Sequence, residues 1–226
     1  GIVAPDAVVA ILRDVLIPFV EGRTADDPPA LYAELYDLMR VRGGSAGFYG
    51  DALAAIDIAL WDLKAKQDDV PLAAALGGAC TATIPAYVSG LPKATLEERV
   101  ALAAAWRARG FRGIKYAAVV SREGVAAEMH ALRAALGDDA DLMVDLHWQY
   151  TADDALALAR ALAAARPYFI EAPCAPEDVA GLSRVAAESG LPVAAGEEWR
   201  NVFEAQLRLE YAPLAYVQPE MAHTGV

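Results

Sequence analysis

The stretch LMVDLHW, residues 142–148, begins as a buried strand and ends on polar side chains. Leu142, Met143 and Val144 form a short apolar run that is typical of a strand inside a sheet. A carboxylate in such a place is costly unless it is paired or bound to a metal ion. If the strand continues to Trp148, Asp145 and His147 face the same way, because side chains alternate along a strand.

Five other short apolar runs occur in the chain, separated by alanine-rich helical segments. They are IPAYVSG (84–90), GIKYA (113–117), YFIEAP (168–173), PVAAGEE (192–198) and AYVQPE (215–220). Together with LMVDLHW, the runs start 29, 29, 26, 24 and 23 residues apart. This regular interval indicates βαβ units and a parallel sheet. No glycine-rich dinucleotide fingerprint is present, which favours a TIM-type (β/α) barrel over a doubly wound sheet.

A complete barrel of this type needs about eight units, and this sequence provides six. We therefore expect an α/β fold with an incomplete (β/α) barrel domain over residues 83–226, containing strands 1–6. An open barrel exposes sheet edges and apolar surface. Either the polypeptide is truncated, or a partner or another segment completes the barrel.

Residues 1–82 have a different pattern. PDAVVAILRDVLIPFV, DPPALYAELYDLMR and DALAAIDIALWDLKAKQ carry apolar residues at helical spacing. The first two have prolines and an aspartate suited to a helix start. This part of the chain is therefore predicted to be a separate, mainly helical domain.

Composition and charge narrow the class of protein. The chain has 226 residues, 56% of them hydrophobic and 22% charged, as in a globular protein. Its net charge of -12 argues against nucleic acid and anionic membrane surfaces as partners. Cys80 and Cys174 make neither a disulfide framework nor a zinc motif, and no segment reads as a signal peptide or a membrane span. We expect a cytoplasmic protein, and its alanine-rich exterior is compatible with a homo-oligomer. Any anionic substrate would need a local positive centre in so acidic a protein.

Three carboxylates occur at matching positions in successive predicted strands. Asp145, Glu171 and Glu197 are spaced 26 and again 26 residues apart. Because the carboxyl ends of parallel barrel strands meet at one mouth, these acids are expected to converge. A divalent cation would offset their repulsion and desolvation, and oxygen donors alone suit Mg2+. Any one of these residues could instead be a helix cap or a solvated rim residue.

The ordered set of motifs resembles the mandelate-racemase branch of the enolase superfamily, over nearly the whole chain. ALAAIDIALWDLKAK and PLAAALGG look like the family's helical capping-domain segment, and GFRGIKYA, MVDLHW, FIEAP, GEEW and VQPE match its successive strand ends. The resemblance implies that residues 1–82 are the mainly helical part of an α+β capping domain. It also implies that Asp145, Glu171 and Glu197 hold Mg2+, which assists removal of a proton next to a carboxylate to give an enediolate.

The second predicted strand contains KYA where many members of this branch have a Lys-x-Lys pair. The second lysine of that pair serves as a base. Alternation places Lys115 and Ala117 on the inner face and Tyr116 on the outer face. Ala117 cannot take a proton, which argues against a two-base racemase. Lys115 is expected to hold the substrate carboxylate or act as the base, with a simple ion pair as the alternative. Tyr116 is expected to pack against helices, and to act as a base only if a bulge turns it inward.

The Asp-x-His arrangement resembles that of the acid-sugar dehydratases of this branch. It implies that His147 is the acid that expels the 3-hydroxyl, with hydrogen bonding at the rim as the alternative. Glu220 stands where the family usually has an Asp that orients a base His from the seventh strand, a strand absent from this sequence. Glu220 would orient that His or lie solvated at the strand end. His223 follows on a loop and is expected to contact substrate.

The glycine-rich segment RGGSAGFYG, residues 42–50, matches the place where the family's capping domain covers the barrel mouth. Arg42 or Tyr49 would read the distal end of the substrate there, unless the segment is an ordinary connector. The predicted activity is that of a lyase. It dehydrates an aldonic or aldaric acid, galactarate-like, to a 2-keto-3-deoxy acid. The alternatives are a racemase, epimerase or cycloisomerase on the same scaffold, or an inactive truncated form.

Overall fold

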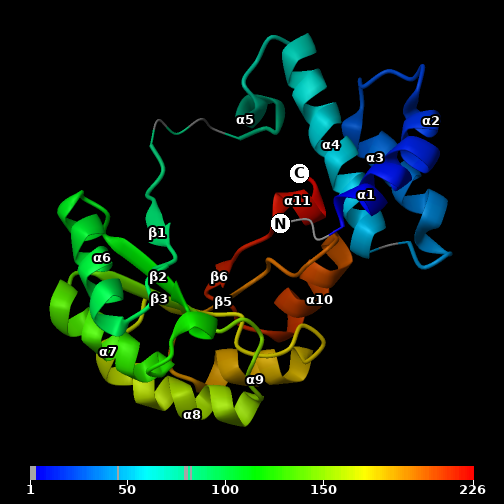
Figure 1. Cartoon of the computed structure of the whole chain (residues 1–226). Helices are drawn as coiled ribbons and strands as arrows, with labels where there is room; N and C mark the ends of the chain where they lie inside the picture. The colour runs from blue at the N-terminus through cyan, green and yellow to red at the C-terminus, as the bar shows by residue number, and fades with distance from the viewer. Residues whose placement is uncertain (1–3, 45, 79–80, 82) are drawn as a thin grey trace. The chain divides into compact units, whose positions relative to one another are not determined.

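The computed structural model describes residues 4–44, 46–78, 81 and 83–226, and Figure 1 shows its helices and strands. The chain divides into two compact units. The first comprises Gly1–Thr83, Glu197–Ala205 and Pro219–Val226, and the second comprises Ile84–Gly196 and Gln206–Gln218. The first unit thus includes two short segments that the sequence assigned to the barrel domain. Cys80 and residue 82, where the predicted domain boundary falls, lie outside the described residues.

The first unit is built of helices. They are α1 (Pro5–Ile11), a π-helical turn (Leu12–Leu16), α2 (Ile17–Val20), α3 (Pro28–Arg40), α4 (Gly47–Gln67), α5 (Leu72–Ala75) and α11 (Met221–Thr224). Prolines occupy the first turns of α1 and α3, where a missing N–H leaves no helical bond unmade. The carboxylate of Asp27 accepts a hydrogen bond from the Ala30 backbone N–H and so caps α3. Leu16, Leu35 and Ala52 are fully buried in the core of this unit.

The second unit contains six parallel strands that pair in sequence order. They are β1 (Tyr87–Ser89), β2 (Gly113–Ala117), β3 (Asp141–Asp145), β4 (Phe169–Glu171), β5 (Val193–Ala195) and β6 (Tyr216–Val217). Parallel pairing of consecutive strands is the topology of a (β/α) barrel, and six strands form an incomplete one. The predicted fold class is therefore confirmed.

Helices alternate with these strands. They are α6 (Leu96–Ala108), α7 (Val125–Leu136), α8 (Ala152–Leu162), α9 (Val179–Glu188) and α10 (Val202–Tyr211), with short 3-10 turns at Ala118–Val120 and Ala163–Ala165. Figure 1 shows α7, α8 and α9 along one side of the strands. Thr95 and Glu98 form a reciprocal capping box at the start of α6. Ile114, Val144 and Ile170, on β2, β3 and β4, are fully buried, so the sheet forms the core of this unit.

The third strand is shorter than predicted. It ends at Asp145 instead of Trp148, because Asp145 Oδ1 accepts a hydrogen bond of 2.9 Å from the backbone N–H of His147. An aspartate that bonds its own backbone two residues on makes a turn. His147 and Trp148 then adopt φ angles of +52° and +55°. Strand alternation, from which we expected His147 to face the same way as Asp145, therefore does not apply, although the two side chains do lie together, with His147 Nδ1 2.7 Å from Asp145 Oδ2.

Within the part of the chain that the structure describes, there is no helix both long enough and apolar enough to cross a membrane.

Candidate metal centre

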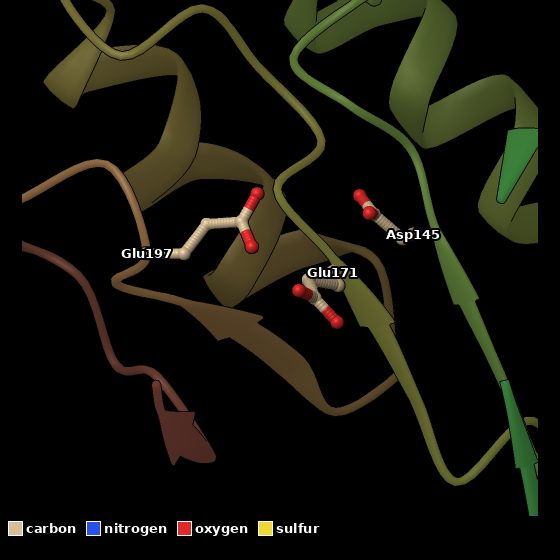
Figure 2. Close-up of side chains that lie close together, drawn as sticks. All are labelled: Asp145, Glu171 and Glu197. Atoms are coloured by element: carbon tan, nitrogen blue, oxygen red, sulfur yellow. The ribbon is translucent and has the colours of Figure 1, made fainter. Parts of the chain in front are cut away.

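Three carboxylates lie together at the ends of neighbouring strands, as Figure 2 shows. Asp145 is the last residue of β3, Glu171 is the last residue of β4, and Glu197 is the second residue after β5. One oxygen atom from each residue lies within 4.8 Å of the others. Strand register explains this proximity, because Asp145 pairs with Glu171 and Glu171 pairs with Ala194. The structure thus brings the three predicted acids together.

The donor set of this cluster suits a hard divalent cation. Asp145 is 6% exposed and Glu171 is 2% exposed, so both charges are largely removed from water. Neighbouring carboxylates repel one another and burial penalises each charge, unless a cation compensates. Oxygen atoms without nitrogen or sulfur donors are the ligands that Mg2+ takes in proteins. Asp145, Glu171 and Glu197 are therefore the residues that would hold such an ion.

Lys115 provides one positive charge at the cluster. Its Nζ donates to Glu171 Oε2 at 2.6 Å, and Lys115 is only 9% exposed. Burial alone would lower the pKa of Lys115. The hydrogen bond and the negative charge of Glu171 outweigh burial and raise that pKa above its usual value. Lys115 therefore lies on the face of β2 where alternation placed it, and it is paired with a strand-end acid.

A second donor to Glu171 was missed in the sequence. Gln218 follows β6, and its Nε2 donates to the same Glu171 Oε2 at 3.3 Å. In the sequence, Gln218 is the uncharged first residue of QPE, and only Glu220 of that motif was interpreted as a site residue. The available signal was its position just after the sixth strand, where side chains are directed to the barrel mouth.

His147 lies beside the cluster although it is not on a strand. Its Nδ1 lies 2.7 Å from Asp145 Oδ2, and its side chain is 38% exposed. The backbone N–H of the same residue bonds the other oxygen of that carboxylate. The left-handed turn after β3 therefore holds the imidazole against Asp145 and leaves part of the ring open to a ligand.

Tyr116 is not placed to act as a base. Its hydroxyl donates to the backbone oxygen of Val125 at 2.6 Å, and the residue is 1% exposed. Burial raises the pKa of the Tyr116 hydroxyl well above its usual value. No bulge turns the side chain inward, so Tyr116 packs on the helix side of β2, the arrangement that alternation predicted.

Glu220 and His223 have structural contacts in the first unit. β6 ends at Val217, so Glu220 is not at a strand end as predicted. It caps α11 by accepting a hydrogen bond from the Ala222 backbone N–H. His223 is in α11, not on a loop, and its Nδ1 lies 2.6 Å from Asp51 Oδ1 of α4. This pair links α11 to α4. His223 is therefore held by a contact within the first unit, and this contact is the physical reason why it is not an exposed loop side chain.

The segment predicted as a glycine-rich loop is partly helical. α4 begins at Gly47, so Tyr49 is in its first turn and not in a loop. Tyr49 is 6% exposed, and its hydroxyl donates to the Leu35 backbone oxygen at 2.5 Å. The prediction that Tyr49 contacts the distal end of the substrate is therefore wrong, because its hydroxyl is buried and hydrogen-bonded within the helical core. Arg42 is exposed and donates to the Leu38 backbone oxygen. Ser45, within the same segment, lies outside the described residues.

Two family descriptions match the chain. Residues 98–226 match the family described as enolase C-terminal domain-like. Residues 3–77 match the N-terminal domain of the mandelate racemase / muconate lactonizing enzyme family. The first match contains all three cluster acids.

Curated proteins with similar sequences include enzymes named for galactonates. A 3,6-anhydro-alpha-L-galactonate cycloisomerase of Streptomyces coelicolor is 35% identical over 189 residues, which are 80% of this chain and 51% of the relative. A D-galactonate dehydratase of Ralstonia nicotianae is 33% identical over 231 residues, which are 97% of this chain and 58% of the relative. The chain therefore spans between 51% and 58% of the length of these two relatives.

Solved structures share the fold over almost the entire chain. A member of the enolase superfamily from Agrobacterium tumefaciens has a TM-score of 0.96 and 48% identity, covering 100% of this chain and 58% of that chain. A racemase from Streptomyces coelicolor A3(2), solved with bound magnesium, has a TM-score of 0.88 and 30% identity. That comparison covers 96% of this chain and 61% of the racemase chain.

Proposed function

Because the chain belongs to the mandelate-racemase branch of the enolase superfamily, we propose that the protein dehydrates an acid sugar with the help of Mg2+. The substrate class is an aldonic or aldaric acid, galactarate-like, and the product is a 2-keto-3-deoxy acid. The observation that carries this proposal is the cluster of Asp145, Glu171 and Glu197 with Lys115 and His147 beside it. The names of the two curated relatives support galactonate-type acids as the substrate class.

Anion binding is the first task of this arrangement. A bound Mg2+ would withdraw electron density from the substrate carboxylate and so acidify the neighbouring C–H bond. Lys115 adds an ammonium group on the inner face of β2, 2.6 Å from Glu171. An ammonium group there binds a carboxylate oxygen of the substrate and counters the charge of three acids that would otherwise repel an anion.

Donation of a proton to the leaving group is the second task. Hydroxide leaves poorly unless it is protonated as it departs, and histidine is the commonest side chain for this work. Since His147 Nδ1 faces Asp145 Oδ2 at 2.7 Å, we assign the donated proton to Nε2. A general base accepts the C2 proton, the 3-hydroxyl takes the proton of His147 Nε2 and departs as water, and the resulting enol tautomerises to the 2-keto-3-deoxy acid.

A screen of acid sugars tests this function. The natural-length protein is incubated with a library of aldonic and aldaric acids that includes galactarate and galactonate. 2-Keto-acid formation is followed with semicarbazide, once with Mg2+ and once with EDTA. We expect Mg2+-dependent keto-acid formation from at least one member, and its loss in Glu171→Gln. Turnover that is equally fast in EDTA, or no turnover of any member, contradicts the proposal.

Cycloisomerisation is the second candidate, and the curated cycloisomerase relative favours it. Dehydration removes one water from the substrate, whereas a cycloisomerase leaves the mass unchanged. Mass spectrometry of the product therefore separates the two. Racemisation is disfavoured because Ala117, which follows Tyr116 on β2, cannot supply a second base. Exchange of the C2 hydrogen with solvent deuterium, without loss of water, would instead support a racemase or epimerase.

A further inference from the structure

One uncharged side chain, which follows strand β6, contacts the carboxylate cluster. Gln218 Nε2 donates to Glu171 Oε2 at 3.3 Å. Lys115 Nζ donates to the same oxygen from β2 at 2.6 Å. Both donors use Oε2, and neither of these two contacts uses the other oxygen, Oε1. Glu171 is therefore oriented from two sides, once by a charged donor and once by a neutral donor.

The backbone of Gln218 is held firmly against β5. Its N–H donates to the Ala195 backbone oxygen at 3.0 Å. A Cβ on Gly196 would lie 2.8 Å from the Gln218 nitrogen, so the two backbones approach as closely as only glycine permits. Gly196 directly precedes Glu197, and the Gln218 side chain bonds Glu171. The contact between Gly196 and Gln218 therefore connects the backbone next to one acid of the cluster with the residue that bonds another.

Stability alone does not explain an amide at this position. Among the described residues, no group donates to Gln218 Oε1, although that atom is buried. A buried acceptor without a partner costs free energy, and an apolar side chain of similar size would avoid that cost. The donor end of the amide is the part with a partner, and its partner is a carboxylate of the proposed metal site.

We propose that Gln218 is a positioning residue that keeps Glu171 in its cation-binding orientation when Lys115 turns to the substrate. This inference rests on the proposed function, in which Lys115 binds the substrate carboxylate. An ammonium drawn to that anion no longer holds Glu171 Oε2 at full strength. Gln218 carries no charge, so it holds Oε2 without competing for the substrate and without repelling the cation. Outer-shell partners of this kind tune metal affinity.

The test is a titration of Mg2+ by calorimetry, without substrate, in two backgrounds. In Lys115→Met, Gln218 is the remaining donor to Oε2 among the described residues, and adding Gln218→Leu is expected to raise the Mg2+ Kd about tenfold. In the wild-type background, the same change is expected to raise Kd by less, because Lys115 still holds Glu171. Gln206→Leu, on the exposed face of α10, is the matched control and should leave Kd unchanged.

Thermal unfolding in EDTA shows that each variant is folded. The inference is overturned if Gln218→Leu, in folded protein, leaves the Mg2+ Kd unchanged in both the wild-type and the Lys115→Met background. Failure of the proposed function looks different. In that case the wild type itself binds no Mg2+, or Glu171→Gln binds it as tightly as the wild type does. If the wild type binds and Glu171→Gln does not, while Gln218→Leu has no effect, only the role of Gln218 is rejected.

Discussion

Gly196 and Gln218 are packed so closely that a Cβ on Gly196 would lie 2.8 Å from the Gln218 backbone nitrogen. Gly196 also has a φ angle of +143°, which other residues rarely adopt. Gly196→Ala is therefore expected to lower the free energy of unfolding by roughly 2–4 kcal/mol, from backbone strain and overpacking together. Urea denaturation measures this loss.

The matched control for that change is Gly190→Ala. Gly190 also has a positive φ, of +69°, but a Cβ there meets no atom within 4 Å. It should lower the free energy of unfolding by only about 1–2 kcal/mol, the cost of the left-handed conformation. Equal losses at the two positions would show that the contact with Gln218 is unimportant.

Arg99 and Glu128 form an ion pair in which both side chains are fully buried. Arg99 Nε donates to Glu128 Oε1 at 2.9 Å, between α6 and α7. Because removal of one partner leaves a buried charge uncompensated, Arg99→Met should destabilise the protein by about 3–5 kcal/mol. Arg99→Met combined with Glu128→Leu should recover much of that loss. A double variant as unstable as the single one in urea denaturation would contradict this assignment.

The decrease in the free energy of unfolding above pH 8 should include a contribution from the buried thiol of Cys174. Burial raises the pKa of this thiol from 9.0 to about 11. Below pH 9 both folded and unfolded thiols are protonated. Between about pH 9 and 11 only the unfolded thiol ionises, so the contribution of Cys174 to stability falls as pH rises through this window. From pH 8 to pH 10, the wild type should lose roughly 1–2 kcal/mol more than Cys174→Ala does. If urea denaturation gave the same pH dependence of the free energy of unfolding for the wild type and Cys174→Ala, this prediction would be disproved.

His147→Gln tests the assigned proton donor. If His147 protonates the departing hydroxyl, this variant should lower kcat for dehydration by about 10²–10⁴-fold. Exchange of the C2 hydrogen with solvent deuterium should persist, because that step does not need the acid. Nuclear magnetic resonance of recovered substrate measures the exchange. Loss of exchange together with dehydration would assign His147 to an earlier step.

The strand-end acids were predictable from the sequence because their environment repeats. Asp145 and Glu171 each end a short apolar run, and parallel register places such ends side by side. β2 was predicted with its observed bounds, Gly113–Ala117. The barrel class followed from the regular interval between runs, which single residues do not alter.

The local geometry of the site was less predictable. No glycine marks the left-handed turn at His147 and Trp148, and the cause is a hydrogen bond from the His147 backbone to the Asp145 side chain. Aspartate favours such turns, but the apolar run concealed that signal. Tyr49 was assigned to a loop because the preceding glycines disguise the first turn of α4.

Contacts between distant parts of the chain could not be predicted from the sequence. Gln218 and Glu171 are 47 residues apart, and His223 and Asp51 are 172 residues apart. No periodicity connects either pair, so tertiary packing alone brings them together. The same holds for the close approach at Gly196, whose glycine could equally have marked an ordinary turn.

The measurement that tests the account most directly is anomalous X-ray scattering from crystals of the protein grown with Mn2+, which accepts the same oxygen ligands as Mg2+. The account predicts a strong anomalous peak bound by one oxygen each from Asp145, Glu171 and Glu197. A cluster without a peak at millimolar Mn2+, with the three side chains directed apart, would contradict it.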